Sequence, residues 1–286
     1  MILVTGATGT VGSEVLASLL PERAGRIRVL TRNPDAVFPT GVEKVVGDLG
    51  SSDLSVLLGG VEVVFLLTDG LRIADHDRRL AAAAARAGVL RIVKLSALSV
   101  GHGSTDPITS WHRIGEDAIR ETGLGWTFLR PTAFMSNALN WASTMASHSV
   151  VHAPFANGRA AVVDPADIGA VAGACLTEDG HDQKVYELTG PEPLTPPDQV
   201  AILGQVLGRA LGYVEADPAD VLHQMTSYGM PADLADAVVE LLRASQEPFN
   251  SEPTPDTTSV TGRPARSFAD WAHAHRAAFL DAPTTW

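Results

Sequence analysis

The sequence of 286 residues lacks several features that would point to particular classes of protein. Its one cysteine, Cys175, excludes a disulfide within the chain and is typical of a protein in a reducing cytoplasm. No apolar run reaches the roughly 20 residues of a membrane-spanning helix, and no basic segment opens the chain, so we expect neither a membrane anchor nor a targeting signal. The net charge of −12 argues against a nucleic-acid partner, because a phosphate backbone is bound by a basic surface.

Lysine is scarce as well. Lys44, Lys94 and Lys184 are the only lysines among 21 basic residues, and this bias, together with abundant alanine and glycine, suggests a bacterial source with a GC-rich genome. Apolar residues make up 45% of the chain, which is typical of a globular protein. The length favours one main domain with a smaller lobe.

The strongest pattern is in the first twelve residues. A short apolar run leads into a loop with Gly6, Gly9 and Gly12, after which apolar residues recur at helical spacing. In a dinucleotide-binding turn the first glycine allows a sharp bend, the second lets the backbone approach a pyrophosphate, and the third lets the helix pack closely. We therefore expect the N–H groups at the start of this helix to face two linked phosphates.

Strand-like and helix-like segments alternate through the first half of the chain. The predicted strands are Ile2–Thr5, Ile27–Thr31, Glu43–Gly47, Val61–Leu67, Arg91–Leu98 and Trp126–Leu129. The predicted helices are Val11–Leu20, Ser52–Leu57, Arg72–Ala87 and Trp111–Glu121. The strands are nearly continuous apolar blocks, as in parallel sheets covered on both faces. This predicts an α/β fold with a doubly wound parallel Rossmann sheet in the order 3-2-1-4-5-6.

The second half predicts a smaller mixed α/β lobe that interleaves with the sheet and roofs the cofactor. We place a dinucleotide-binding domain at 1–150 and a substrate-binding lobe at 151–286. The segment Val150–Val163 is expected to form a hairpin or paired extended segments around Asn157-Gly158. The other expected elements are helices Asp164–Leu176, Gln199–Leu207, Pro218–Gly229, Ala232–Ser245 and Phe268–Leu280, strands Lys184–Leu188 and Tyr213–Ala216, and a loop over Gln246–Pro264.

The choice of coenzyme depends on the end of the second strand. NAD-specific sites carry an acidic residue there, whereas this chain has Arg32, whose guanidinium suits a 2′-phosphate. We therefore expect NADP(H), although Arg32 could also be a solvated side chain in the turn at Asn33-Pro34. Asp48, followed by Leu49, is placed to bind the adenine amino group, or alternatively to cap the helix that follows.

The carboxyl ends of strands four to six should hold the chemistry, because ligands bind there in open α/β sheets. These ends carry Leu67-Thr68, Ser96 and Pro131. His112 and Glu116 are four residues apart and so share one helix face, where a carboxylate could orient an imidazole for proton transfer. Alternatively, Glu116 pairs with Arg120 on a solvated face and His112 only shapes the pocket, while Ser96 either binds a substrate carbonyl or caps a loop.

Three further features of the sequence bear on ligands. Phe134, Met135, Trp141 and Met145 would form an apolar substrate wall, unless they are core residues. We expect no metal site, because His273 and His275 are two apart on a helix and diverge. The segment 75–77, Asp-His-Asp, is interpreted as a solvated helix face.

Several stretches together resemble one family. They are ILVTGATGTVG at the start, SALS at 96–99, HRIGE at 112–116, GLGWTFLRPTAFMSN, VVDPADIGAVAGACL, YELTGPEPLT and VTGRPARSFADWAHAHRAAF. The chain is similar to the NmrA-like atypical short-chain dehydrogenase/reductases, in particular to quinone reductase-like and ergot-alkaloid reductase-like members. The resemblance implies cofactor contacts at Gly6, Thr8, Gly9, Thr10, Val11 and Gly12, an adenosine end at Arg32 and Asp48, and a nicotinamide side at Thr68 and Pro131.

One departure from the wider superfamily affects the reaction. Ordinary members use a Tyr-x-x-x-Lys pair for proton transfer, and none of Tyr186, Tyr213 and Tyr228 is followed by lysine at that spacing. The leading hypothesis is a cytoplasmic NADPH-dependent reductase that transfers hydride to a quinone, enone, ketone or iminium and could form a homodimer. The alternative is a non-catalytic NADP-sensing regulator that acts through a protein partner, and an epimerase or lyase is a weaker one.

Overall fold

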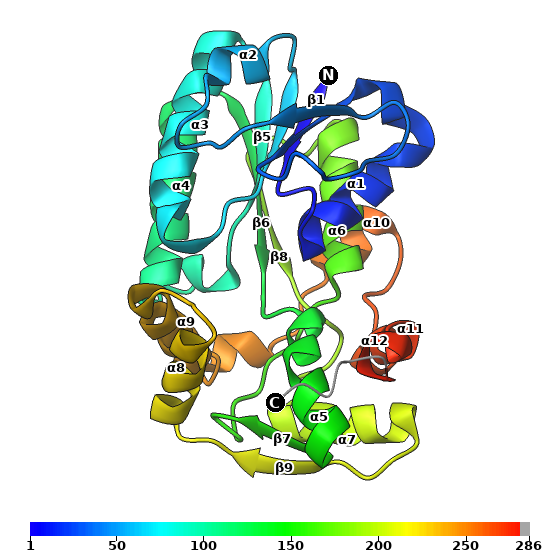
Figure 1. Cartoon of the computed structure of the whole chain (residues 1–286). Helices are drawn as coiled ribbons and strands as arrows, with labels where there is room; N and C mark the ends of the chain where they lie inside the picture. Colours follow the sequence, from blue (N-terminus) through cyan, green and yellow to red (C-terminus); the bar gives the residue numbers. More distant parts are fainter. Residues whose placement is uncertain (281–286) are drawn as a thin grey trace.

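The computed structural model describes residues 1–280, with the backbone alone at Pro21 and Glu22, so residues 281–286 of the expected second lobe lie outside the described range. A large sheet with helices on both faces forms one part of the molecule, and a smaller group of helices and short strands lies beyond one end of it (Figure 1).

The large sheet has seven parallel strands in the order β3-β2-β1-β4-β5-β6-β8. Their bounds are β1 Ile2–Thr5, β2 Ile27–Thr31, β3 Glu43–Val46, β4 Val63–Leu66, β5 Arg91–Leu95, β6 Gly125–Pro131 and β8 Lys184–Leu188. The predicted Rossmann order of the first six strands is confirmed. The last strand was expected in the second half but joins the main sheet, where Lys184 lies opposite Thr127 of β6.

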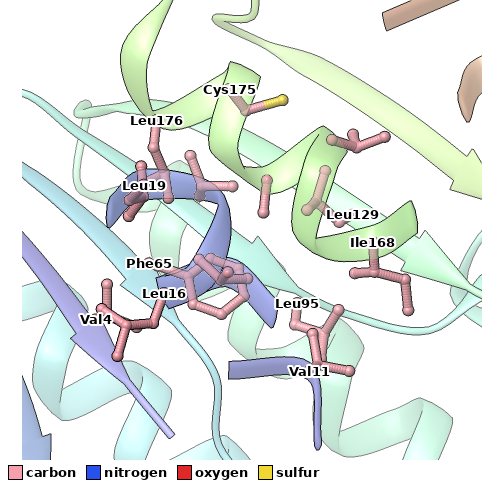
Figure 2. Packing of buried hydrophobic residues seen from close by; sticks show 14 of the residues in the cluster. Val4, Val11, Leu16, Leu19, Phe65, Leu95, Leu129, Ile168, Cys175 and Leu176 are labelled. Carbon is pink, nitrogen blue, oxygen red and sulfur yellow. The ribbon is translucent and has the colours of Figure 1, made fainter. Parts of the chain in front are cut away.

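One face of the sheet is covered by α1 (Thr10–Arg23) and α6 (Pro165–Thr177). The two helices can approach closely because α6 has glycines at the contact: a Cβ on Gly169 would lie 2.7 Å from the backbone carbon of Glu14. Apolar side chains from both helices pack together on the strands (Figure 2). Cys175 belongs to this core, and its burial raises the pKa of the thiol to about 12, so it acts as a small buried side chain and not as a nucleophile.

The other face is covered by α2 (Leu54–Leu58), α3 (Ile73–Ala87) and α4 (Pro107–Glu121). Short 3-10 turns lie between the strands and helices: η1 Ala24–Arg26, η2 Gly70–Arg72 and η3 Leu98–Val100. The chain begins α4 at a strong signal, because Asp106 caps the helix by accepting from the Thr109 N–H at 2.9 Å, and Pro107 follows it. The carboxyl ends of β4 and β5 are followed by loops that contain η2 and η3 and then by α3 and α4, which lie on this face (Figure 1).

The remaining elements form the smaller part. They are η4 Met135–Trp141, α5 Ala142–His148, β7 Val150–Ala153, α7 Pro196–Leu207, β9 Gly212–Glu215, α8 Pro218–Ser227, α9 Ala232–Ala244, η5 Pro248–Ser251, α10 Asp256–Thr261, α11 Phe268–Ala274 and α12 Arg276–Leu280. Its apolar core is separate from the two cores on the sheet and includes Met135, Leu203 and Trp271. The α8–α9 pair lies beside the end of α4 (Figure 1).

The expected hairpin over Val150–Val163 is wrong. The Asn157-Gly158 turn forms, with the Gly158 N–H bonded to the Phe155 carbonyl, but β7 pairs in parallel with β9. The chain after the turn instead makes single bridges, from Ala160 to Leu194 and from Val163 to Phe134. A turn signal in the sequence predicts pairing between the segments on either side of the turn. The strand that pairs with β7 is instead β9, some sixty residues further along the chain.

Two further expectations on the second half need correction. The segment Gln246–Pro264, predicted as a loop, contains η5 and α10, and the Asp256 carboxylate on α10 accepts from the Glu187 N–H on β8 at 2.7 Å. The closing helix is divided in two at His275, whose ring stacks on Trp271. None of the helices within residues 1–280 is long and apolar enough to cross a membrane.

Candidate active site at the carboxyl ends of the strands

The loop between β1 and α1 has the conformation that its glycines predict. Gly6 has a φ of +68°, and its carbonyl accepts from the Gly9 N–H at 2.9 Å. A Cβ on Gly12 would lie 2.0 Å from the Gly6 oxygen, so the turn and the helix meet too closely for any side chain there. Gly9 is the N-cap of α1 and offers no side-chain cap, which leaves the first N–H groups of the helix available to an anion. The loop therefore fits a pyrophosphate.

The other predicted loop residues differ in what they can present to a ligand. Thr8, Gly9 and Thr10 are exposed and form the outer rim of the loop. Val11 is 3% exposed and packs into the core, so only its backbone can face a phosphate. The floor of the loop is Leu67, whose Cδ2 lies 2.7 Å from the position that a Cβ on Gly6 would take.

Arg32 follows β2 at the same edge of the sheet. Its side chain is exposed, and it has no hydrogen bond or ion pair with another of the described residues. The turn after it forms as predicted, with the Asp35 N–H bonded to the Asn33 side chain at 2.9 Å. A guanidinium free of protein partners is available to a phosphate, which is consistent with the expected contact to a 2′-phosphate.

Asp48 lies in the loop after β3 and does not cap the helix that follows. The N-cap of α2 is Asp53, which accepts from the Ser55 N–H at 2.9 Å, so the alternative role for Asp48 is wrong. Asp48 instead accepts from the Gly50 N–H at 2.7 Å within its own turn. Leu49 is buried beneath this turn, and its carbonyl accepts from Arg79 on α3 at 2.8 Å, which fixes the loop in place.

Glu116 is a buried ion-pair residue and does not orient His112. Its two carboxylate oxygens accept from Arg130 on β6 at 2.9 and 2.6 Å, and one also accepts from Arg120 at 3.0 Å. The Ser96 hydroxyl donates to the same carboxylate at 2.7 Å. The expected pair with Arg120 is confirmed, but the solvated face is wrong because Glu116 is fully buried. Glu116 and His112 share one helix face, but Glu116 bonds to Arg130 on β6, whereas His112 contacts a residue on β5.

His112 contacts a residue that the sequence analysis did not single out. Its Nδ1 lies 3.3 Å from Nζ of Lys94 on β5, and Lys94 forms an ion pair with Asp77 on α3 at 2.6 Å. Both charged residues are fully buried, so the interpretation of 75–77 as a solvated helix face is wrong for Asp77. The Thr68 hydroxyl after β4 donates to Asp77 at 2.7 Å. Thr68, Asp77, Lys94 and His112 thus form a linked series of four side chains.

Two signals in the sequence could have revealed this pair. Asp77 lies between Ile73 and Leu80 at the helical spacing of the buried face of α3, where a carboxylate needs a partner. Lys94 is the one charge inside the apolar run that forms β5, between Val93 and Leu95. A buried acid and a buried base on neighbouring elements are expected to pair, because neither can be left alone in an apolar interior.

Burial lowers the pKa of His112 well below its ordinary value of 6.5, and the positive charge of Lys94 lowers it further. The folded protein therefore keeps His112 neutral at pH values where the unfolded chain protonates it. We expect the free energy of unfolding to fall as the pH drops below about 6.5, by up to roughly 1.4 kcal/mol per pH unit, until the folded pKa is reached.

This pH effect can be isolated by comparing denaturant unfolding of the wild type and His112→Gln between pH 7.5 and 5. The variant should lack the component of the slope that His112 contributes, while the contributions of all other groups are shared by both proteins. Equal slopes in the two proteins would contradict a depressed pKa for His112.

The residues expected to contact a substrate follow β6, and they differ from one another in how far they are buried. Pro131 is buried at the end of β6, and Phe134 and Trp141 are partly exposed in the segment that leads into the smaller part. Met135 and Met145 are 1% and 0% exposed and belong to the core of that part, which favours the core alternative over a substrate wall for these two residues. No cluster of three or more metal-binding side chains occurs among residues 1–280.

A parallel sheet with a glycine-rich first turn, an uncapped helix behind it and a basic side chain at the end of the second strand defines a dinucleotide-binding protein of the Rossmann class. The NmrA-like family model matches residues 1–286, and the chain belongs to this family. The family resemblance noted in the sequence is thereby confirmed.

Several relatives of the chain are named as reductases. It is 42% identical over 283 residues to the (4-alkanoyl-5-oxo-2,5-dihydrofuran-3-yl)methyl phosphate reductase of Streptomyces griseus, covering 98% of this chain and 99% of that one. It is 36% identical over 286 residues to the NAD(P)H azoreductase of Xenophilus azovorans, covering 98% and 99%. The structure of the NADPH-dependent quinone oxidoreductase QOR2 of Escherichia coli complexed with NADPH superposes with a TM-score of 0.84 at 28% identity, covering 97% of this chain and 100% of that one.

Proposed function

We propose that this protein is an NADPH-dependent oxidoreductase that reduces a small organic substrate. The observation that carries the proposal is the loop from Gly6 to Gly12, with its uncapped helix. It is supported by the similarity of the chain to an NAD(P)H azoreductase and to an NADPH-dependent quinone oxidoreductase. NADPH supplies the hydride when it is bound. The chain supplies the phosphate cradle, the guanidinium of Arg32 and a group of polar side chains at the ends of the neighbouring strands.

We assign the roles of the predicted residues as follows. The backbone from Gly6 to Gly12 holds the pyrophosphate, Arg32 the 2′-phosphate, and Asp48 with Leu49 the adenine. Leu67, Thr68 and Pro131 border the nicotinamide. His112 contacts the substrate, with Phe134 and Trp141 on its apolar side, whereas Ser96 and Glu116 hold α4 against β5 and β6. An iminium substrate needs no proton, and a quinone, enone or ketone can take its proton from water, so the missing Tyr–Lys pair does not prevent reduction.

The reaction is tested by following NADPH absorbance with the purified protein against a panel of quinones, enones, ketones, cyclic imines and azo compounds. We expect turnover with at least one class. Tight NADPH binding without turnover on the whole panel would favour the NADP-sensing regulator and would overturn the proposal.

The assignment of Arg32 makes a prediction of its own. Replacing it by alanine should raise the dissociation constant for NADPH by about ten- to a hundredfold, because a charged hydrogen bond contributes about 1.5–3 kcal/mol, and should leave NADH binding almost unchanged. Fluorescence titration of both nucleotides measures the effect. Arg86→Ala, an exposed arginine on the last turn of α3, is the control for the loss of one positive charge. Equal losses for NADH and NADPH would contradict the 2′-phosphate contact.

We further propose that the protein is bacterial, works in the cytoplasm on a small-molecule substrate and does not bind nucleic acid. The inert buried thiol of Cys175 and the net charge of −12 support this proposal. A homodimer is the assembly that we propose, and light scattering of the purified protein tests it.

A further inference from the structure

The buried pair formed by Lys94 and Asp77 has no place in the roles assigned above. Nζ and Oδ2 are 2.6 Å apart, and both side chains are fully buried between the sheet and α3–α4. Gly115 on α4 makes room for them, because a Cβ there would lie 2.1 Å from Asp77 Oδ2 and 3.0 Å from Lys94 Cε. Removing two charges from water costs several kcal/mol per ion, so a pair of this kind is weak evidence for stability and asks for another explanation.

The ammonium of Lys94 determines the protonation of His112. An ammonium has N–H donors and no acceptor. Lys94 Nζ forms an ion pair with Asp77 Oδ2 and has two hydrogen-bond partners, the Leu95 carbonyl at 3.1 Å and His112 Nδ1 at 3.3 Å. Nδ1 must therefore accept, which requires a lone pair on that atom. The neutral ring then carries its proton on Nε2.

The Nε2 atom of His112 lies at the end of the series of side chains formed by Thr68, Asp77, Lys94 and His112. No described residue forms a hydrogen bond with it, and it does not occur among the fully buried side-chain nitrogens that lack a partner in residues 1–280. His112 as a whole residue keeps 9% of its surface exposed. An N–H at Nε2 is therefore open to a ligand.

At its other end the series of side chains includes Thr68, which was assigned above to border the nicotinamide. The Thr68 hydroxyl donates to Asp77 Oδ1 at 2.7 Å, so the loop after β4 and the His112 ring on α4 are tied to one ion pair. A shift of the ring would break a buried hydrogen bond to an ammonium, and a shift of Thr68 would break a partly buried hydrogen bond to a carboxylate. Both losses are costly, because hydrogen bonds to charged groups are strong where water is excluded. The arrangement holds the cofactor rim and the ring in a fixed relation.

We propose that Lys94 and Asp77 are positioning residues that fix His112 as a neutral Nε2–H donor, directed at a substrate oxygen. When a carbonyl carbon or its vinylogous position accepts hydride, the electron pair of the C=O bond moves onto oxygen, where Nε2–H stabilises it and water supplies the proton. The site therefore favours quinones, enones or ketones over a cationic iminium, which develops no oxyanion. The preference for carbonyl substrates rests on the proposed function. The assignment of the His112 proton to Nε2 does not depend on it.

The surrounding charges support a neutral ring. Burial and Lys94 both lower the pKa of His112. The groups that face this cluster are Lys94 on β5 and Asp77 on α3, while on its own helix Glu116 is held by Arg130, and Arg113 donates to the Ser104 carbonyl at 2.9 Å. The described ion pairs and hydrogen bonds thus place no carboxylate on the ring, where one would favour imidazolium.

The tautomer is measured directly by long-range ¹H–¹⁵N spectra of the histidine side chains, with His112→Gln to assign the signals. In the wild type we expect a protonated Nε2 and an unprotonated Nδ1 from pH 8 down to pH 6. The double variant D77L/K94M replaces the ion pair with apolar side chains of similar size, a change that buried pairs commonly tolerate. It should release Nδ1, giving a mixture of tautomers and a higher pKa of His112.

A matched control is D167N/R266M, which removes a buried aspartate and its arginine between α6 and the C-terminal segment. It should leave the tautomer of His112 unchanged. A wild-type ring protonated at Nδ1, or a D77L/K94M spectrum identical to that of the wild type, would overturn the proposal.

Kinetics test the consequence for the substrate. D77L/K94M should lower kcat on a quinone or enone by about tenfold or more, with a change of less than about threefold in the dissociation constant for NADPH, and should spare reduction of an iminium. D77N/K94Q, whose glutamine amide can still donate to Nδ1, should regain part of kcat. Equal losses on carbonyl and iminium substrates would refute the oxyanion role. Absence of turnover in the wild type would refute the proposed function, while the spectra would still decide the tautomer.

Discussion

Gly9→Ala is expected to leave the protein folded and to weaken NADPH binding on the order of a hundredfold, about 2.8 kcal/mol. Gly9 has an extended backbone, with φ −89° and ψ 173°, that alanine adopts without strain, and the nearest protein atom to an added Cβ is the Gly6 oxygen at 3.4 Å. The protein itself therefore accepts the methyl group. Only a ligand brought against the N-terminus of α1 meets it, so the loss of affinity reports on the phosphate cradle.

Gly12→Ala should have a different outcome. Its Cβ would lie 2.0 Å from the Gly6 oxygen and 2.5 Å from the Gly6 carbon, both backbone atoms that cannot turn aside. We expect a loss of about 3 kcal/mol or more in the free energy of unfolding, together with the loss of NADPH binding. Thermal unfolding and fluorescence titration separate the two variants. Gly25→Ala, where nothing lies within 4 Å of the added Cβ, should change neither quantity. A Gly9→Ala protein that binds NADPH as the wild type does would place the nucleotide elsewhere.

The parts of the fold that could be predicted from the sequence are those set by local patterns. The apolar blocks of β1 and β2 and the glycine turn between β1 and α1 lie where the pattern placed them, with the same bounds for both strands. Parallel pairing with right-handed crossovers then leaves few possible strand orders. The capped start of α6 at Asp164 is likewise readable, because the cap uses residues next to each other in the chain. The helix predicted over Gln199–Leu207 begins earlier, at Pro196, where Thr195 is the N-cap of α7.

The errors in the prediction arise where two segments that are distant in sequence pack or pair with each other. The pairing of β7 with β9 and the division of the closing helix at His275 depend on packing within the smaller part, which no local signal encodes. In the site, the spacing of His112 and Glu116 correctly places both on one helix face. The partner of each is decided by what lies across from it: Lys94 for His112 and Arg130 for Glu116. Spacing along a helix cannot supply that information.

Glu116→Ala is expected to destabilise the protein by about 3–5 kcal/mol, because it leaves the Arg130 guanidinium buried without its carboxylate. Arg130 is 12% exposed and bonds Glu116 through two nitrogens, at 2.9 and 2.6 Å. Arg120, the second partner, also lies over the ring of Phe128 and keeps that contact when the carboxylate is removed. The loss should therefore come from Arg130 and from the Ser96 hydroxyl, which would have no acceptor.

A neighbouring residue on the same helix provides the comparison. Asp117 pairs with the other side of Arg120 at 2.9 Å but is 58% exposed, so Asp117→Ala should change the free energy of unfolding by at most about 1 kcal/mol. Glu116→Gln keeps one acceptor oxygen and should lie between the two. Chemical denaturation of the three variants measures these differences. If Glu116 were instead the proton-transfer partner of His112, Glu116→Gln would retain wild-type stability and lose kcat, the opposite of what a buried carboxylate held by Ser96, Arg120 and Arg130 implies.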